Sequence, residues 1–258
     1  MIRRAPSLAV VALTTTLAVS ASGASARQGG TPLLDDWLAS AEGLRSSLEL
    51  AIQEAPGRYD LRWIAAREYS NAAAVERDED VVKDFGRAAR DHALVAVELD
   101  PSGVEGHYWL AVAAGVLAEA EGGRTKVRMA EESWNESGWI LQRDSLHAGA
   151  HHLQGRIHAA VMRVGSITRF LARLLLGGEV LGQASWERAE YHLRRAADLD
   201  PDVAMHHFEL AMAFRDTDRP EAMLAALERA ARAAGGRPID ERYRERAAAL
   251  LEGRSDRN

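Results

Sequence analysis

The sequence predicts an all-α fold: a right-handed superhelix of about four stacked helix pairs, with an inserted apolar helix and a capping helix. Three observations lead to this prediction. Ala, Leu, Arg and Glu dominate the chain while aromatic residues make up only 6% of it, and all four are good helix formers. No segment alternates apolar and polar residues for long enough to predict a β-strand. One spacing of small and apolar residues occurs twice, 100 residues apart, which is close to three periods of 34 residues.

The repeated segment runs from Ala89 to Pro101 and again from Ala189 to Pro201. In both copies small or apolar residues stand at positions 0, 4, 7 and 10, and Leu-Asp-Pro ends the segment. Residues at this spacing lie on one stripe of a helix, and the small ones let a neighbouring helix approach closely. The proline prevents the helix from continuing. Each helix pair therefore has an apolar face that a neighbouring pair must cover, which is why such units form arrays.

The first 26 residues are typical of a secretory signal peptide. Arg3 and Arg4 form a basic start, Leu8–Val19 is an apolar run, and Ala24–Ala26 is a small-residue cleavage signal. The apolar run is short for a bilayer span, although an uncleaved membrane anchor is the alternative. We therefore expect export to the periplasm or the outside, and a mature chain without a stable membrane span.

The remaining chain divides into a flexible, glycine-rich lead-in at residues 27–33, a solenoid domain at 34–253 and a tail at 254–258. We predict a first helix over Leu34–Glu54 and a capping helix over Ile239–Leu251. The four pairs between them are expected over Tyr59–Ala74 with Val81–Leu99, Val104–Glu121 with Arg124–Leu141, Leu146–Arg163 with Trp186–Leu199, and Asp202–Arg215 with Pro220–Ala234.

An additional helix is predicted over Ile167–Leu176, inside the third pair. Its apolar residues lie almost all round the helix, which is typical of a buried or ligand-covering helix. This helix supports an alternative function, in which the protein binds a small molecule or a lipid.

Charge and composition exclude several classes of function. The chain carries 32 Lys and Arg against 38 Asp and Glu, a formal net charge of −6, and loss of the two signal arginines would make it −8. A chain this acidic is a poor candidate for non-specific nucleic-acid binding. It has no cysteine, so disulfides, thiolate catalysis and a lipid-modified cysteine are all excluded.

Histidines are the most prominent candidates for chemistry. His147, His151 and His158 share one helix face, and a histidine pair at i, i+4 can chelate a divalent metal. The segment between His147 and His151 lacks the glutamate of the H-E-x-x-H motif, and no carboxylate nearby completes a metal site. We therefore predict no metal and expect helix packing, with a metal-dependent enzyme as the third alternative. The same packing role is expected for His107, His206 and His207.

No other motif predicts catalysis or a cofactor. Gly122–Lys126 is a glycine turn before a helix and suggests an anion site, but it lacks the spacing of a nucleotide-binding loop. The chain has no G-x-S-x-G nucleophile elbow. We predict a protein that is not an enzyme.

The repeated spacing is similar to the second helix of a tetratricopeptide (TPR) unit. Beyond the repeat, the order of motifs between Tyr59 and Leu251 resembles the regulator of microtubule dynamics family, which has bacterial members. The resemblance implies a scaffold of stacked helices, and the export signal prevents a microtubule role from being carried over. The motifs that carry it are Arg62–Tyr69, Ala93–Pro101, His107–Trp109, Glu121–Lys126, His151–Arg156, Leu175–Gly178 and Glu190–Pro201.

In the TPR pattern, the first helix of each pair lines a concave groove. A mixture of aromatic, apolar and arginine side chains suits a peptide or an acidic chain end. We therefore predict a non-enzymatic exported scaffold that binds a protein or peptide partner in this groove. The register of the helices nominates Tyr108, Val112, His151, Arg156, Phe208, Met212 and Arg215 as the lining residues.

Overall fold

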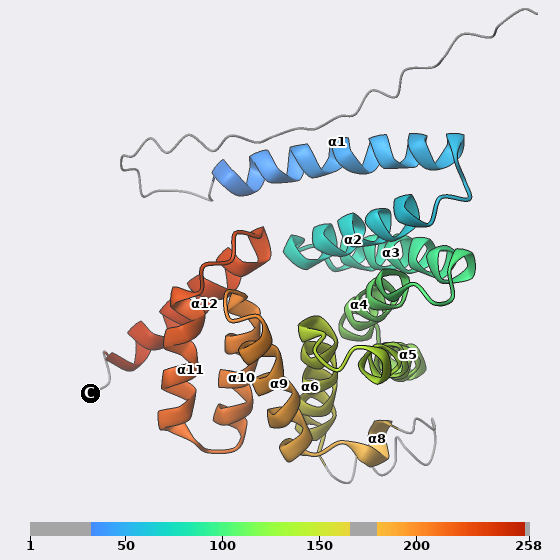
Figure 1. Cartoon of the computed structure of the whole chain (residues 1–258). Coiled ribbons are helices and arrows are strands. Elements are labelled where there is room, and N and C mark those ends of the chain that lie inside the picture. The colour runs from blue at the N-terminus through green and yellow to red at the C-terminus, as the bar shows by residue number, and fades with distance from the viewer. Residues whose placement is uncertain (1–31, 166–179, 256–258) are drawn as a thin grey trace, which may run out of the picture. The chain divides into compact units, whose positions relative to one another are not determined.

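Every regular element in the described part of the chain, residues 32–165 and 180–255, is a helix in this computed structural model (Figure 1). These residues belong to one packed unit that begins at Pro32. The predicted signal peptide and the predicted helix Ile167–Leu176 lie outside the described residues. In chain order the helices are α1 (Pro32–Glu54), α2 (Tyr59–Val75), α3 (Glu79–Leu99), α4 (Val104–Ala120), α5 (Gly123–Arg143), α6 (Ala148–Arg163), α8 (Val180–Gln183), α9 (Trp186–Leu199), α10 (Ala204–Asp216), α11 (Pro220–Arg232) and α12 (Pro238–Ser255).

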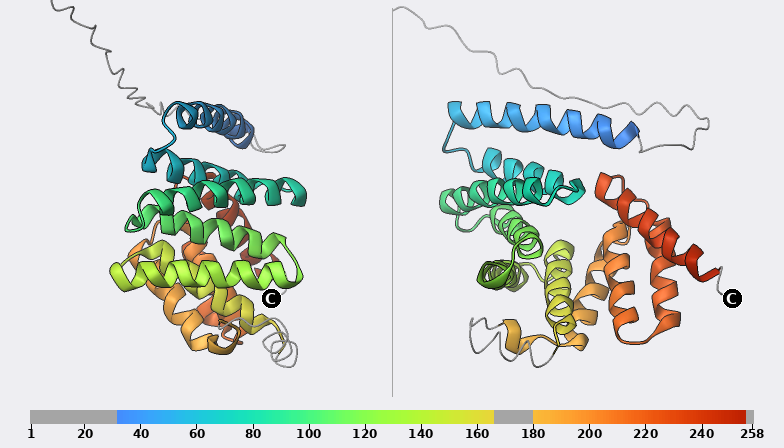
Figure 2. Two further views of the ribbon diagram at one scale, coloured as in Figure 1. Left: turned by 90° about the vertical axis from the view of Figure 1, so that its right-hand side faces the viewer. Right: turned by 180° about the vertical axis from the view of Figure 1, so that it is seen from behind.

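The helices pack as consecutive pairs, and this confirms the predicted solenoid of four TPR-like units. Extensive contacts join α2 to α3, α4 to α5, α6 to α9 and α10 to α11. Each pair also contacts the next through adjacent helices, α3 with α4, α5 with α6, and α9 with α10 (Figures 1 and 2). α12 packs on α11 and α10, in the position expected for the capping helix.

The helix boundaries differ from the predicted ones by a few residues, for local reasons. α1 begins at Pro32, inside the predicted lead-in, and proline suits the first turn of a helix because it lacks only an N–H that has no partner there. α6 begins at Ala148 because the ring of His147 caps it, accepting a hydrogen bond from the N–H of Ala150 at 3.1 Å. α12 continues to Ser255, into the predicted tail.

The predicted stripe of small residues lies at the helix contacts. Ala89, Ala93 and Ala96 of α3 are completely buried, as are their counterparts Ala189 and Ala196 of α9. Small side chains at these positions let the backbones of paired helices approach closely. Close packing therefore follows from residues that the repeated spacing had identified.

A glycine makes the α6–α9 contact possible. A Cβ atom at Gly155 would lie 2.6 Å from Cγ of Leu193 and 3.0 Å from its backbone nitrogen. Leu193 itself is 1% exposed, so it has no free space to move into. The third pair therefore depends on the absence of a side chain at Gly155.

The loop before α12 is tied to the rest of the array by hydrogen bonds. The N–H of Gly235 donates to the carbonyl of Asp202 at 2.7 Å, and Arg244 donates to the carbonyls of Ala233 and Gly235. Arg242 of α12 also donates to the carbonyl of Ala74, at 2.9 Å, near the end of α2. α12 therefore bridges the last helix pair and the first.

Five helices contact one another in a closed cycle that forms the inner face of the array. They are the first helices of the four pairs together with α12, in the order α2, α4, α6, α10, α12 and back to α2. The largest group of buried apolar residues lies at one part of this cycle, around α9, α10, α11 and α12. The return of α12 to α2 places side chains of the capping helix on the inner face, where the sequence predicted an open groove.

Candidate functional site

Arg156 of α6 is the centre of an ionic network on the inner face. Its guanidinium donates to Glu119 of α4, and its Nε lies 3.6 Å from Oε1 of Glu209 of α10. Burial acts to lower the pKa of Arg156, but the negative charges of Glu119 and Glu209 outweigh it and raise the pKa. Burial raises the pKa of Tyr243 of α12, and the positive charge of Arg156 acts to lower it. The predicted groove residue Arg156 therefore joins three inner helices to one another.

The predicted residues of α4, Tyr108 and Val112, are half-buried. The ring of Tyr108 lies 4.8 Å from that of His147, and a Cβ atom at Gly149 would come within 2.4 Å of its hydroxyl. Tyr108 therefore packs against the start of the next inner helix, α6, and burial raises the pKa of its hydroxyl. It contributes to the inner face mainly through this contact between pairs.

Phe208 is placed on the inner helix α10 as predicted, but α12 covers it. It is 1% exposed. The ring of Tyr243 meets it edge-on at 5.2 Å between centroids, and the guanidinium of Arg246 lies 4.4 Å from the centre of the Phe208 ring. The expectation that Phe208 lines an open groove is corrected here, because the repeat register alone does not show that the capping helix fills this position.

His151 is also corrected, because it points to the second helix of its own pair. Its Nδ1 lies 2.9 Å from Nδ1 of His192 on α9, and its Nε2 lies 3.1 Å from the carbonyl of Ser145. It is 4% exposed. The residue one position later, His152, faces the inner helix α10, where its Nδ1 lies 3.0 Å from that of His206. A one-residue difference in register accounts for the error.

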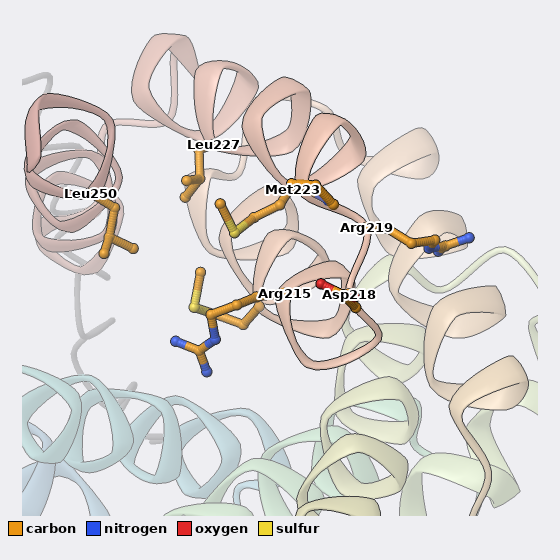
Figure 3. Close-up of a pocket in the computed structure, with 8 residues that line it drawn as sticks. Arg215, Asp218, Arg219, Met223, Leu227 and Leu250 are labelled. Atoms are coloured by element: carbon orange, nitrogen blue, oxygen red, sulfur yellow. The ribbon is translucent and has the colours of Figure 1, made fainter. Parts of the chain in front are cut away.

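Met212 and Arg215 line a pocket of about 300 Å³ where α10, α11 and α12 meet (Figure 3). Its floor is apolar and contains two methionines, Met212 and Met223, which adapt their shape readily. Leu227 of α11 and Leu250 of α12 point into it, and Leu250 remains 41% exposed at the mouth (Figure 3). The volume lies at the lower end of the range for ligand pockets, so it suits one or two apolar side chains.

The turn between α10 and α11 places two cations on the rim of this pocket. Asp218 adopts a left-handed φ of 57°, and the N–H of Arg219 then donates to the carbonyl of Phe214 at 2.9 Å, as in a Schellman helix end. Arg219 stacks on the ring of Phe214 and binds Glu190 at 2.5 Å, while Arg215 hydrogen-bonds Asp216. Both side chains remain partly exposed, that of Arg219 by 43% and that of Arg215 by 55%.

Sequence reasoning missed most of this pocket. It found Met212 and Arg215 from the register of α10, but it could not include Leu250, because nothing in the repeat predicts where a capping helix lies. Met223 and Leu227 lie on the second helix of the last pair, which the TPR pattern places away from the groove. The carboxylates that engage Arg156, namely Glu119 and Glu209, were missed because they come from two other helices.

A second pocket, of about 320 Å³, lies where the array closes. Arg67, Asn71 and Val75 of α2 line one side of it, and Pro238 and Ile239 of α12 line the other. Its lining also includes Glu68, which accepts a hydrogen bond from Arg67 at 2.7 Å. This pocket marks the contact through which α12 completes the cycle of inner helices.

Three of the histidines predicted to pack between helices occupy the same position in different repeats. His107, His151 and His207 each lie in the first turns of an inner helix, and the Nε2 of each approaches the carbonyl six residues earlier at 2.9–3.1 Å. Their Nδ1 atoms differ: that of His107 lies 2.5 Å from Glu136, that of His151 meets His192, and that of His207 is buried without a partner among the described residues.

The described residues contain no group of three or more His, Cys, Asp or Glu side chains placed to hold a metal ion. Burial lowers the pKa of His158 and His192 to about 4 and that of His206 to about 3, so these rings are neutral at pH 7. The described helices also include none that is long and apolar enough to cross a membrane. The site that remains is the inner face with its pocket.

Consecutive antiparallel pairs with small residues at their contacts define a helical-repeat protein of the TPR class. The crystal structure of TTC0263, a thermophilic TPR protein of Thermus thermophilus, matches this fold with a TM-score of 0.59 and 19% identity, over 85% of this chain and 94% of that one. The crystal structure of MamA matches with a TM-score of 0.46 and 10% identity, over 76% and 90% of the two chains.

A family model places the chain more closely. The model described as regulator of microtubule dynamics protein 1-3 matches residues 35–255, and the chain belongs to this family. No curated protein matches the chain in sequence. The resemblance inferred from the order of motifs is thus confirmed.

Proposed function

We propose that the chain is an exported, non-enzymatic scaffold that binds an apolar segment of a protein or peptide partner, with the pocket between α10, α11 and α12 as its anchor point. The observation that carries the proposal is this pocket: Met212, Met223 and Leu227 form an apolar floor, and Leu250 leaves an apolar side chain exposed at its mouth. Burying such a surface against a partner is favourable, since each buried methylene contributes about 0.8 kcal/mol.

Charge around the pocket indicates which segment fits. Arg215 and Arg219 pair with Asp216 and Glu190 but keep partly exposed guanidinium groups on the rim. The lining itself contains one carboxylate, that of Asp218. Arginine binds carboxylates with two parallel hydrogen bonds and is enriched at the anchor points of interfaces. The partner segment would therefore place an apolar side chain in the pocket next to a carboxylate.

Export is part of the same proposal and rests on the basic start, the apolar run and the small-residue cleavage signal of residues 1–26. Fractionation of cells that express the full chain, followed by N-terminal sequencing, tests it. A mature protein outside the cytoplasm that begins at Arg27 is the expected result. An intact N-terminus in the cytoplasm would contradict it.

Site-specific photo-crosslinking tests the binding site. A photoreactive amino acid at Leu250 should capture one saturable partner, whereas the same residue at Leu50 of α1, 63% exposed, serves as the matched control. The substitution Leu250→Asp should abolish binding of that partner, because it places a charge at the mouth of the apolar pocket. Equal crosslinking from both positions, or unchanged binding by Leu250→Asp, would contradict the pocket as the anchor.

The alternative of a small-molecule or lipid binder is motivated by the predicted helix Ile167–Leu176, which lies outside the described residues. Native mass spectrometry of the purified chain distinguishes it. A bound small molecule or lipid that survives purification and is lost on removing this segment would favour the alternative.

A further inference from the structure

Five histidines gather where α6 meets α9 and α10, at the middle of the array. His151 of α6 meets His192 of α9 with 2.9 Å between their Nδ1 atoms, and His152 of α6 meets His206 of α10 at 3.0 Å. His158 lies further along α6, and its ring stacks on that of His192 with 5.9 Å between the ring centroids. The helix α6 is thus joined to both of its C-terminal neighbours through histidine pairs.

The hydrogen bond within each pair requires one Nδ1 atom that carries no proton. The Nε2 of His151 faces the carbonyl of Ser145, so it carries the proton and its Nδ1 must accept one from His192. A pair that takes up one proton keeps its hydrogen bond, from an imidazolium N–H to the neutral ring, but it then holds a buried charge. When both rings of a pair are protonated, no acceptor nitrogen is left and two N–H groups face each other across about 3 Å. The first proton therefore adds the cost of a buried charge to each pair, and the second makes the contact between the rings repulsive.

The surroundings offer the protonated rings little compensation. Arg195 and His147 add positive potential at His151, and Arg188 does so at His158 and His192. Asp144, in the turn before α6, is the carboxylate that acts on His151, and the ring of Tyr191 lies edge-on to it.

At the second pair, the charged groups that act on the histidines are again cations. Arg156 and Arg237 act on His152, and Arg237 and His207 act on His206. Arg156 is balanced by Glu119 and Glu209, and Arg237 by Asp240, which it binds at 2.9 and 3.2 Å. These carboxylates are engaged by arginines and are not directed at the rings.

Burial is nearly complete at the cluster. His151, His152, His158 and His206 are 2–4% exposed. Burial is also the main reason that the pKa of each lies below the ordinary histidine value of 6.5. His192 is half-buried, but the other four rings gain access to water only if α6 moves away from its partners.

We propose that this cluster is an acid-operated latch: protonation of the histidine pairs separates α6 from α9 and α10 while the first two helix pairs stay packed. The latch opens the inner face between α6 and α10, and it does so whether or not a partner binds at the pocket. It is a property of the array that is independent of the proposed function.

The opening equilibrium depends on pH because the open and closed states bind different numbers of protons. In the open state the rings have an ordinary pKa near 6.5, and in the closed state the pKa is lower, so the open state binds more protons between the two values. The closed latch is therefore most stable above pH 6.5 and weakens as the pH falls towards 4. For one histidine with a closed pKa of about 4, the opening equilibrium constant rises on the order of twenty-fold between pH 7 and pH 5.

Hydrogen–deuterium exchange of the full chain at pH 7 and pH 5, expressed as protection factors, tests the latch directly. Protection in α6, α9 and α10 should fall by about twenty-fold or more, while α2–α5 keep theirs. Equal loss of protection in all helices, or none in α6, α9 and α10, overturns the proposal without any variant.

Variants test whether the histidines are the cause. His192→Asn with His206→Asn keeps a neutral partner at each pair, because the asparagine amide replaces Nδ1 and its oxygen can accept a proton from the remaining ring. This variant should lose less protection at pH 5 than the parent chain, with His158 as the main remaining buried ring that titrates. The matched control His92→Asn removes a histidine that faces Glu49 at 2.9 Å, and should open like the parent chain.

If the double variant does not fold at pH 7, the single variant His158→Asn gives the same readout, since it removes one buried titrating ring and no histidine–histidine hydrogen bond. It should lose less protection at pH 5 than the parent. Protection factors of His158→Asn equal to those of the parent chain would overturn the assignment to the histidines.

Discussion

The two halves of the array use histidine in opposite ways. In the N-terminal pairs, His92 lies 2.9 Å from Glu49 and His107 lies 2.5 Å from Glu136, so each ring has a carboxylate beside it. In the C-terminal half, His151 and His152 each face another histidine. The comparison shows that histidines between packed helices have a carboxylate as partner in one half of the array and a second histidine in the other.

The largest expected effect is a fall in the free energy of unfolding at low pH, caused by the buried histidines of the C-terminal half. Burial holds the pKa of His158 at about 4 against 6.5 in an unfolded chain, so the unfolded state binds the extra proton between these values. Its contribution to stability is fully present above pH 6.5 and is lost as the pH falls towards 4. The loss is on the order of 3 kcal/mol for this one ring. Urea unfolding at pH 7.5 and pH 4.5 measures it, and His158→Asn should flatten the difference.

A second prediction concerns close packing in the C-terminal half. Gly155→Val places a side chain where a Cβ atom already lies 2.6 Å from Leu193, and it should lower the free energy of unfolding by about 3 kcal/mol. Gly138→Ala in α5 is the matched control, because its Cβ would meet Gln154 at an ordinary 3.5 Å. The control should raise stability by about 0.5–1 kcal/mol through better helix propensity. Similar effects from both variants would show that the α6–α9 contact is not tight.

The smallest of the three effects is the loss of stability expected when a histidine of the N-terminal pairs loses its carboxylate partner. Glu136→Ala leaves Nδ1 of His107 buried beneath Trp139 without its carboxylate, which should cost about 1–3 kcal/mol in urea unfolding at pH 7. Arg232→Ala is the control, since its ion pair with Glu228 is exposed, and it should change stability by less than about 0.5 kcal/mol. An effect of Glu136→Ala no larger than the control would show that the carboxylate does not stabilise this unit.

The fold could be predicted almost entirely from sequence because its signals are local. The stripe from Ala89 to Leu99 and the prolines that follow α3 and α9, Pro101 and Pro201, act within one helix or one turn. They predicted the four pairs, and the bounds of α9 agree residue for residue with the structure. The short helix α8 at Val180–Gln183 was not predicted, since four residues carry no periodic pattern.

The candidate site could be predicted only in part. The register of a single helix predicted Met212 and Arg215 as inner-face residues, and both line the pocket. Phe208 and His151 were misplaced for two different reasons. The first is covered by α12, a helix that the repeat pattern does not position, and the second lies one residue away from the inward position that His152 occupies.

The sequence by itself determined the helical class, the four units, the family and the residues that pack between helices, because all of these follow from local spacings and from the order of short motifs along the chain. Only the tertiary structure decided that α12 returns to α2, that the inner face closes, and that histidines from α6, α9 and α10 meet one another. These contacts join residues 41 to 168 positions apart. Such contacts depend on the summed rotation of successive pairs, a geometric quantity that no single motif contains.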